Sequence, residues 1–321
     1  MLKQLKMLFG DFAQFFRKDF HLAAYTWTVA VTALSILIVY GTTFGKSIAA
    51  NTVPTSSKII NNILIFALIY FLVAIPVTII RGEWRTLSKP AFLLKGLLLM
   101  CLIGFADAFS WRDTINLQNL SALEQSYIHK VLWRMRNIIF VLPTLAVLRL
   151  TIDRDVKGLY GIGSGNHHVK AYLSLYVVIL PILAVVSLTP DFQSYYPSYK
   201  PWIYENVFGQ PVWLNTIIYE IIYISDFFMV ETIFRGVLVI GMASILGRTA
   251  VLPMIAVYVA LHFGKPVMET ASALFGGYFL GVLAFQTRHI WGGVIIHMGI
   301  AFIIEILRFV QHYFEISGFK L

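Results

Sequence analysis

Long runs of apolar residues constrain this chain more than any other feature of its sequence. Runs of about twenty such residues recur between residues 24 and 310, and each could cross a hydrocarbon core of about 30 Å as a helix. A bilayer core offers no water to backbone N–H and C=O groups, so spanning segments are helices or closed barrels. Charged residues make up only 13% of the chain, against about a quarter in soluble domains. The sequence therefore predicts an all-α, polytopic helical membrane protein.

Nine stretches are candidate spans, and we expect about eight to nine transmembrane helices. The fourth of them is short and carries Arg136. The sixth would be about 50 Å long as a single helix, so it must tilt, protrude or break; Asp226, near its middle, is the expected place for a bend. The predicted spans are residues 24–42, 59–80, 91–109, 135–150, 169–188, 212–246, 250–264, 268–286 and 289–310.

The formal net charge of +9 would suggest nucleic acid as a partner in a soluble domain. In membrane proteins, however, Lys and Arg gather in cytoplasmic loops, and here they occur before the first span and after the second and fourth. We therefore expect the lipid bilayer as a partner, no nucleic acid, and a cytoplasmic N-terminus. Residues 1–22 combine positive charges with aromatic residues, which predicts an amphipathic segment at the membrane interface.

Three polar sites interrupt the apolar runs of the last third of the chain. Glu231 and Arg235 are four residues apart, so on a helix they share one face and neutralise each other. His262 and His297 each lie in a span of their own. Ionisable side chains within a membrane cost a few kcal/mol each on the mildest scale, so several of them together usually mark a functional site.

These four residues allow more than one interpretation. Each histidine alone could be a core imidazole bonded to a backbone carbonyl, and Glu231 with Arg235 could be a structural ion pair. A proton-relaying transporter also places such groups near the midplane, but no matching pair of interrupted spans appears in both halves of the chain. At similar depths on three spans, one carboxylate and two imidazoles are also what hydrolysis by an activated water requires.

Three known classes of intramembrane protease have motifs that this sequence lacks. It contains no His-Glu-x-x-His pair of a zinc protease, no Gly-x-Ser-Gly of a rhomboid protease and no Gly-x-Gly-Asp of the presenilin type. Its polar residues instead resemble those of the CPBP family, which includes CAAX prenyl protease 2 and the bacterial Abi-type endopeptidases. That family has Glu-Glu-x-x-x-Arg, Phe-x-x-x-His and His-x-x-x-Asn or Asp on successive spans. The matching segments here are Val230–Arg235, Tyr258–His262 and His297–Ala301.

Two positions depart from the family pattern. The first glutamate of the pair, thought to activate water in the family, is Val230, and the residue expected to be Asn or Asp is Ala301. An active enzyme would then use Glu231 as its general base or take another acid, for which Asp226 and Glu269 are the candidates. The departures also allow a pseudoprotease that binds a peptide or membrane-protein partner without cleaving it.

The resemblance implies an intramembrane endopeptidase that acts on a membrane-associated peptide or protein. In that reading Glu231 and His262 polarise a water molecule, His297 helps to bind the oxyanion or the water, and Arg235 keeps Glu231 ionised. No cofactor is certain; a divalent metal such as Zn²⁺ held by Glu231, His262 and His297 is the alternative chemistry. The implied protease core is residues 205–312, residues 23–190 would be an accessory bundle, and the expected location is a bacterial inner membrane.

Overall fold

The computed structural model of the chain describes residues 2–49, 55–154, 156, 158–163 and 169–316. Within these ranges the regular structure is entirely helical, without a strand. Seven helical stretches of the described residues are long and apolar enough to cross a membrane. The predicted class, an all-α polytopic membrane protein, is confirmed.

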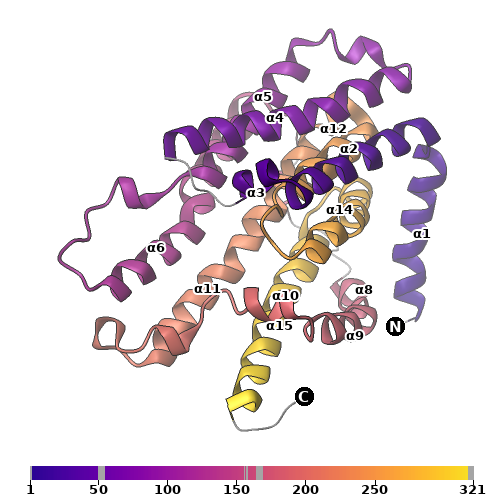
Figure 1. Ribbon diagram of the computed structural model, residues 1–321. Helices are drawn as coiled ribbons and strands as arrows, with labels where there is room; N and C mark the ends of the chain where they lie inside the picture. The colour runs from indigo at the N-terminus through magenta and orange to yellow at the C-terminus, as the bar shows by residue number, and fades with distance from the viewer. Residues whose placement is uncertain (1, 50–54, 155, 157, 164–168, 317–321) are drawn as a thin grey trace.

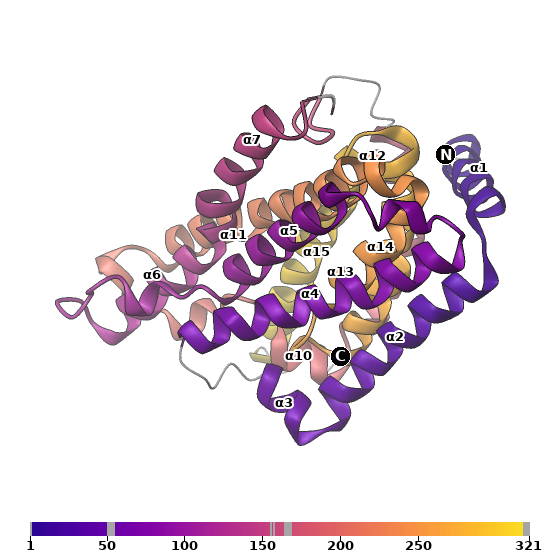
Figure 2. The ribbon, with the colours of Figure 1, turned by 90° about the horizontal axis from the view of Figure 1, so that it is seen from above.

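The first three predicted spans form helices close to the expected bounds. They are α2 (Leu22–Gly41), α4 (Thr55–Ile80) and α5 (Pro90–Ala108), and a short α3 (Thr43–Ala49) follows α2. Helices α2 and α4 lie side by side over α13 (Val251–Ala260) (Figures 1 and 2). The N-terminal half of the chain therefore packs directly against an element of the last third.

The predicted amphipathic segment at the N-terminus is the helix α1 (Leu2–Asp19). Its apolar face is buried at Leu8 and Phe15, and Phe12 makes an edge contact with Tyr278 on α14 (Val267–Thr287) at 5.5 Å between ring centroids. In Figure 1 it stands at the edge of the bundle beside α14. Its location at a membrane interface stays a prediction.

The fourth span begins earlier than its apolar run. The helical stretch Ala122–Thr151 contains α6 (Ala122–Arg136), a π turn η3 (Asn137–Val141) and α7 (Leu142–Thr151). A capping box starts it, in which the Glu124 carboxylate accepts from the Ser121 backbone N–H at 2.8 Å. Hydropathy did not predict this start, because α6 contains many polar residues.

Two other predicted spans do not form separate long helices. Residues 169–188 fold as α8 (Val169–Ser174) and α9 (Tyr176–Val186), which are separated at Leu175. The stretch 250–264 contains only the ten-residue α13, which joins the preceding run in one 49-residue apolar segment. These two differences account for seven candidate spans where nine were predicted.

The long run from residue 212 is helical through α11 (Val212–Glu231) and the π-helical η6 (Thr232–Gly241). The bend expected at Asp226 is wrong, because α11 keeps helical geometry there. The chain instead reverses after α12 (Ala243–Leu246) at Gly247, whose φ of +56° suits a glycine. It then passes through η7 (Gly247–Ala250) into α13, and α14 and α15 (Trp291–Ile316) follow.

Three polar residues at one end of the bundle fix the position of η6. The Lys95 ammonium donates to Asp153 at 2.6 Å and to the Gly241 carbonyl at 2.7 Å. The Tyr160 hydroxyl donates to the other Asp153 oxygen at 2.6 Å, and burial raises the pKa of Tyr160 above its usual range. A methyl group at Gly236 would lie 2.8 Å from the Tyr160 carbonyl oxygen, so the glycine permits this close contact.

The remaining short elements lie in the connections between the long helices. They are η1 (Trp84–Thr86), η2 (Trp111–Asp113), α10 (Pro190–Tyr195), η4 (Pro201–Ile203) and η5 (Val207–Gly209).

Candidate active site

Glu231 is the central group of the polar cluster, and it ends α11 where the helix widens into η6. Its side chain is fully buried. The Oε1 atom lies 2.8 Å from Arg235 Nη1 and 2.9 Å from His297 Nδ1. Its Oε2 atom has no hydrogen-bond partner among the described residues. One carboxylate oxygen is therefore held in place, and the other keeps its capacity to accept a proton or a hydrogen bond.

Arg235 lies one turn after Glu231 and is also fully buried. Its guanidinium stands over the Tyr258 ring, with Cζ 4.3 Å from the ring centroid, a geometry that favours a cation on an aromatic face. The predicted ion pair is present, with both side chains fully buried and Arg235 Nη1 2.8 Å from Glu231 Oε1.

His262 follows α13 in the turn that leads to α14. Its Nδ1 atom lies 2.8 Å from the Tyr258 carbonyl oxygen, and since a carbonyl can only accept, Nδ1 carries the proton. In a neutral imidazole this leaves Nε2 with a lone pair. Thr270 fixes the turn, because its hydroxyl donates to the His262 carbonyl at 2.8 Å.

His297 lies on α15 and presents Nδ1 to Glu231, so the carboxylate orients this ring. Its side chain is 12% exposed, whereas Glu231 and Arg235 are at 0%. The Tyr258 ring contacts both imidazoles, with centroids 4.7 Å from His262 and 6.1 Å from His297. The structure therefore brings the four predicted residues together around one tyrosine; their catalytic roles stay a prediction.

Gly293 contributes to the site, and the sequence reading missed it. A methyl group built at this position would overlap Glu231 Oε2. Only a glycine lets α15 pass this close to the carboxylate while His297, one turn later, reaches the other oxygen. The signal was the pair Gly292–Gly293 one turn before His297, which reads equally well as ordinary helix packing.

We expect Gly293→Ala to displace Glu231 and to lower the proposed peptidase activity at least tenfold, because the added methyl overlaps the free carboxylate oxygen. The measurement is cleavage by reconstituted protein. Gly276→Ala is the matched control, since a methyl group at Gly276 on α14 meets nothing within 4 Å. Equal activity of the two variants would contradict the placement of α15 against Glu231.

The two alternative acids have partners elsewhere. Asp226 accepts from the Asn137 side-chain amide at 2.7 Å and lies 3.8 Å from Arg134, so it joins α11 to α6 and η3. Glu269 bonds Lys265 at 2.7 Å and accepts from the Tyr196 hydroxyl at 2.8 Å. Neither carboxylate contacts Glu231 in the described part of the chain, so Glu231 is the acid that the cluster offers.

The three predicted metal ligands do not form a metal site as they are placed. Zn²⁺ requires ligand atoms about 2.0 to 2.2 Å from one point, and no group of three His, Cys, Asp or Glu side chains in the described ranges could hold an ion. We therefore derive no step through a metal. The divalent-metal alternative stays a prediction, which activity measured after chelation and after Zn²⁺ addition would test.

The comparison with protein families singles out this same part of the chain. The family model described as "Type II CAAX prenyl endopeptidase Rce1-like" matches residues 212–303. This segment is Rce1-like. It begins with α11 and ends within α15, so it contains Glu231, Arg235, His262 and His297. The resemblance to the CAAX prenyl protease family is thereby confirmed. Neither a curated protein nor a solved structure matches the chain.

Both departures from the family pattern are apolar residues packed in the Rce1-like segment. Val230 is 9% exposed and belongs to the main hydrophobic core. Ala301 is 3% exposed and packs in a smaller cluster with Tyr223 and Phe227. At these two positions the side chains are apolar and packed, so neither Val230 nor Ala301 contributes a polar group to the cluster.

Proposed function

We propose that this protein is an intramembrane endopeptidase that hydrolyses a peptide bond of a membrane-associated peptide or protein. The observation that carries the proposal is the contact of Glu231 Oε1 with His297 Nδ1 at 2.9 Å, inside an Rce1-like segment that also supplies His262. A carboxylate and two imidazoles in a site shielded from bulk solvent are suited to activating a single bound water molecule. The match of residues 212–303 to the family model supports the protease class; the residue roles are our inference.

The free oxygen of Glu231 is the base in this proposal. Oε2 takes one proton from a water molecule. The Nε2 lone pair of His262 accepts a hydrogen bond from the other O–H of the same molecule and so orients it. The hydroxide so formed adds to the peptide carbonyl carbon. Arg235 pairs with Oε1 at 2.8 Å and holds the carboxylate so that Oε2 stays free to act as the base.

His297 then holds the group that came from water. Its Nδ1–H donates to Glu231 Oε1, so the Nε2 atom of the neutral ring keeps a lone pair. In the tetrahedral intermediate this lone pair accepts a hydrogen bond from the newly added hydroxyl group. Transfer of the proton from Glu231 to the leaving amine breaks the C–N bond and restores the base.

A second candidate function is a pseudoprotease that holds a peptide or membrane-protein partner. The apolar packing of Val230 and Ala301 favours it, since two groups that are polar in the family pattern are missing. Val230→Glu distinguishes the two functions. A large gain of cleavage would support the pseudoprotease, and unchanged cleavage would support Glu231 as the base.

The direct test of the proposed function is cleavage of membrane-anchored peptides by protein reconstituted in lipid, with wild type compared to His262→Ala. We expect wild type to cleave and the variant to lose most activity while its helical content is unchanged. Normal cleavage by a folded His262→Ala variant would refute the proposed site.

For location, we propose a bacterial inner membrane with the N-terminus in the cytoplasm. The seven candidate spans support an integral membrane protein, and basic loops such as residues 81–89 support the orientation. In a protein that also carries Cys101→Ser, we expect Lys89→Cys to be labelled by a membrane-impermeant reagent from the cytoplasmic side. Labelling from the opposite side would reverse the orientation.

A further inference from the structure

A polar cavity of about 480 Å³ opens beside α6, outside the site described above. We call it the α6 pocket. Tyr219 is its only contribution from the Rce1-like segment. None of the described side chains that line it is acidic. They are Ser110, Trp111, Arg112, Ser126, His129, Lys130, Trp133, Arg134, Tyr195, Ser198 and Tyr219.

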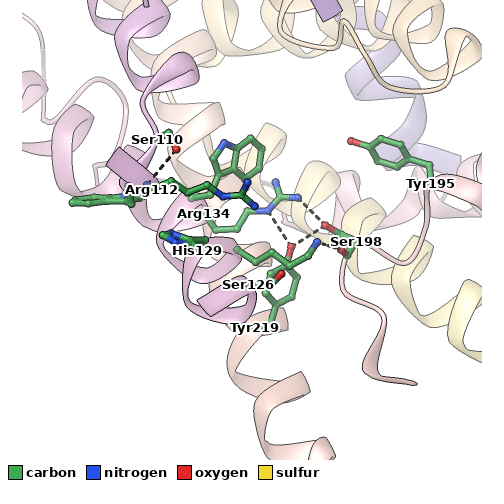
Figure 3. Close-up of a pocket in the computed structure, with 11 residues that line it drawn as sticks. Ser110, Arg112, Ser126, His129, Arg134, Tyr195, Ser198 and Tyr219 are labelled. Atoms are coloured by element: carbon green, nitrogen blue, oxygen red, sulfur yellow. Dashed lines mark hydrogen bonds between the residues drawn. The ribbon is translucent and has the colours of Figure 1, made fainter. Parts of the chain in front are cut away.

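Cationic donors converge on Ser198 at one wall of the α6 pocket. Arg134 Nη2 donates to Ser198 Oγ at 2.8 Å, and Lys130 Nζ donates to the Ser198 carbonyl at 3.2 Å. Figure 3 shows Arg134 reaching both Ser198 and Tyr219, with Tyr195 on the same side as Ser198 and with Arg112 on the other side. An ammonium has three donors, so Lys130 keeps donors for a ligand.

Two other donors of the α6 pocket have no hydrogen-bond partner in the described part of the chain. Arg112 is exposed and bonds Ser110 through its backbone N–H at 3.3 Å, while its guanidinium makes no bond there. His129 Nδ1 is buried without a partner. Two carboxylates offset part of the positive charge: Asp226 lies 3.8 Å from Arg134, and Glu305, which accepts from the Ser198 backbone N–H at 2.9 Å, attracts Lys130. Arg112 therefore presents the least compensated charge of the pocket, and Lys130 adds its free donors.

The rim of the α6 pocket carries a tryptophan on a candidate membrane span. Trp133 is 37% exposed and stands against the guanidiniums of Arg134 and Arg136, at 4.5 and 3.9 Å from its ring. The helical stretch that carries it is a candidate span, and tryptophans favour the depth of lipid headgroups. The pocket thus presents its cationic donors beside a residue suited to the headgroup region of a bilayer.

The position of the charges is itself unusual. Helix α5 separates the loop with Arg81, Arg85 and Lys89 from the loop that carries Arg112, so the α6 pocket lies at the other end of the bundle from that basic loop. Lys and Arg tend to gather in the loops on the cytoplasmic side of a membrane. That tendency does not account for basic residues at both ends of α5. A ligand that requires positive charge explains them.

We propose that the α6 pocket binds the phosphate group of an anionic membrane lipid, with Arg112 and Lys130 as the main cationic contacts. Arg and Lys are the usual phosphate binders, because charge-assisted hydrogen bonds to phosphate oxygens are short and strong. Free phosphate shares this chemistry, but the half-exposed Trp133 at the rim, on a candidate membrane span, favours the phosphate of a lipid headgroup. This inference does not depend on the proposed peptidase activity.

The test is a titration of the purified full-length protein in a nonionic detergent with three probes, followed by calorimetry. They are dihexanoylphosphatidylglycerol, dihexanoylphosphatidylcholine and inorganic phosphate. We expect saturable binding of the phosphatidylglycerol and at least tenfold weaker binding to the double variant Arg112→Gln, Lys130→Gln. Arg85→Gln is the matched control, because Arg85 also stands beside a tryptophan, 5.7 Å from the ring of Trp84, but lies outside the pocket.

The outcomes separate the sources of the phosphate. Binding of the phosphatidylglycerol alone supports a lipid, and equal binding of inorganic phosphate supports the same oxyanion site with a soluble ligand. The proposal is overturned by equally tight binding of the phosphatidylcholine, or by an affinity that the double variant leaves unchanged. Binding of a soluble acidic peptide in the absence of binding by all three probes would also overturn it.

Discussion

Glu231→Gln is expected to lower the turnover number for peptide cleavage by about 100-fold to 10,000-fold, the range that a positioned general base contributes. The amide cannot take a proton from water. Glutamine keeps the size of the side chain, and its oxygen can still accept from Arg235 Nη1, which lies 2.8 Å from Oε1. The measurement is single-turnover cleavage by protein reconstituted in lipid.

A matched substitution separates this effect from a general disturbance of buried charge. Glu269→Gln changes another carboxylate in the same part of the bundle, one held by Lys265 and Tyr196. We expect it to keep activity within a few fold. If Glu231→Gln and Glu269→Gln behaved alike, Glu231 would not be the base.

Arg235→Met is expected to destabilise the protein by about 3 to 5 kcal/mol, the cost of leaving one partner of a buried ion pair without its opposite charge. Both side chains are fully buried, so water does not replace the lost partner. The free energy of unfolding is measured by denaturant titration in mixed micelles.

The double variant Glu231→Gln, Arg235→Met shows whether that cost comes from the uncompensated carboxylate. It removes both charges, so we expect it to recover most of the stability that Arg235→Met loses. An equal loss in the single and double variants would assign the effect to packing against Tyr258. Arg85→Met, at an exposed position, is expected to change stability by less than about 0.5 kcal/mol.

The spans were predicted from the length of their apolar runs. The prediction agrees with the structure where one uninterrupted run forms one helix. Helices α2, α4 and α5 end within a few residues of their predicted bounds, since each is a single apolar run with polar ends. The start of the fourth span at α6 was not predicted, because the lysine and arginines of α6 lower its hydropathy, although a capping box starts the helix. The separation of α8 from α9 was not predicted either, because composition alone does not show that the helix is interrupted at Leu175.

The sequence predicted which residues form the polar cluster, but it did not predict how their side chains are oriented. Spacing placed Glu231 and Arg235 on one helical face, and depth along the spans allowed both histidines to meet them. Which nitrogen of each imidazole faces which oxygen depends on tertiary packing, above all on Gly293 and Tyr258. Tyr258 occupied a motif position, yet its contacts with Arg235 and both histidines followed only from the fold.

Comparison of membrane-protein N-termini in cells that carry the wild-type protein with those in cells that carry Glu231→Gln tests the central claim most directly. If Glu231 activates water for peptide hydrolysis, new N-termini within membrane-associated proteins appear only with the wild type, and they identify the substrate. Identical sets of N-termini, together with a partner that co-purifies equally with both forms, would contradict the peptidase and support the binding protein.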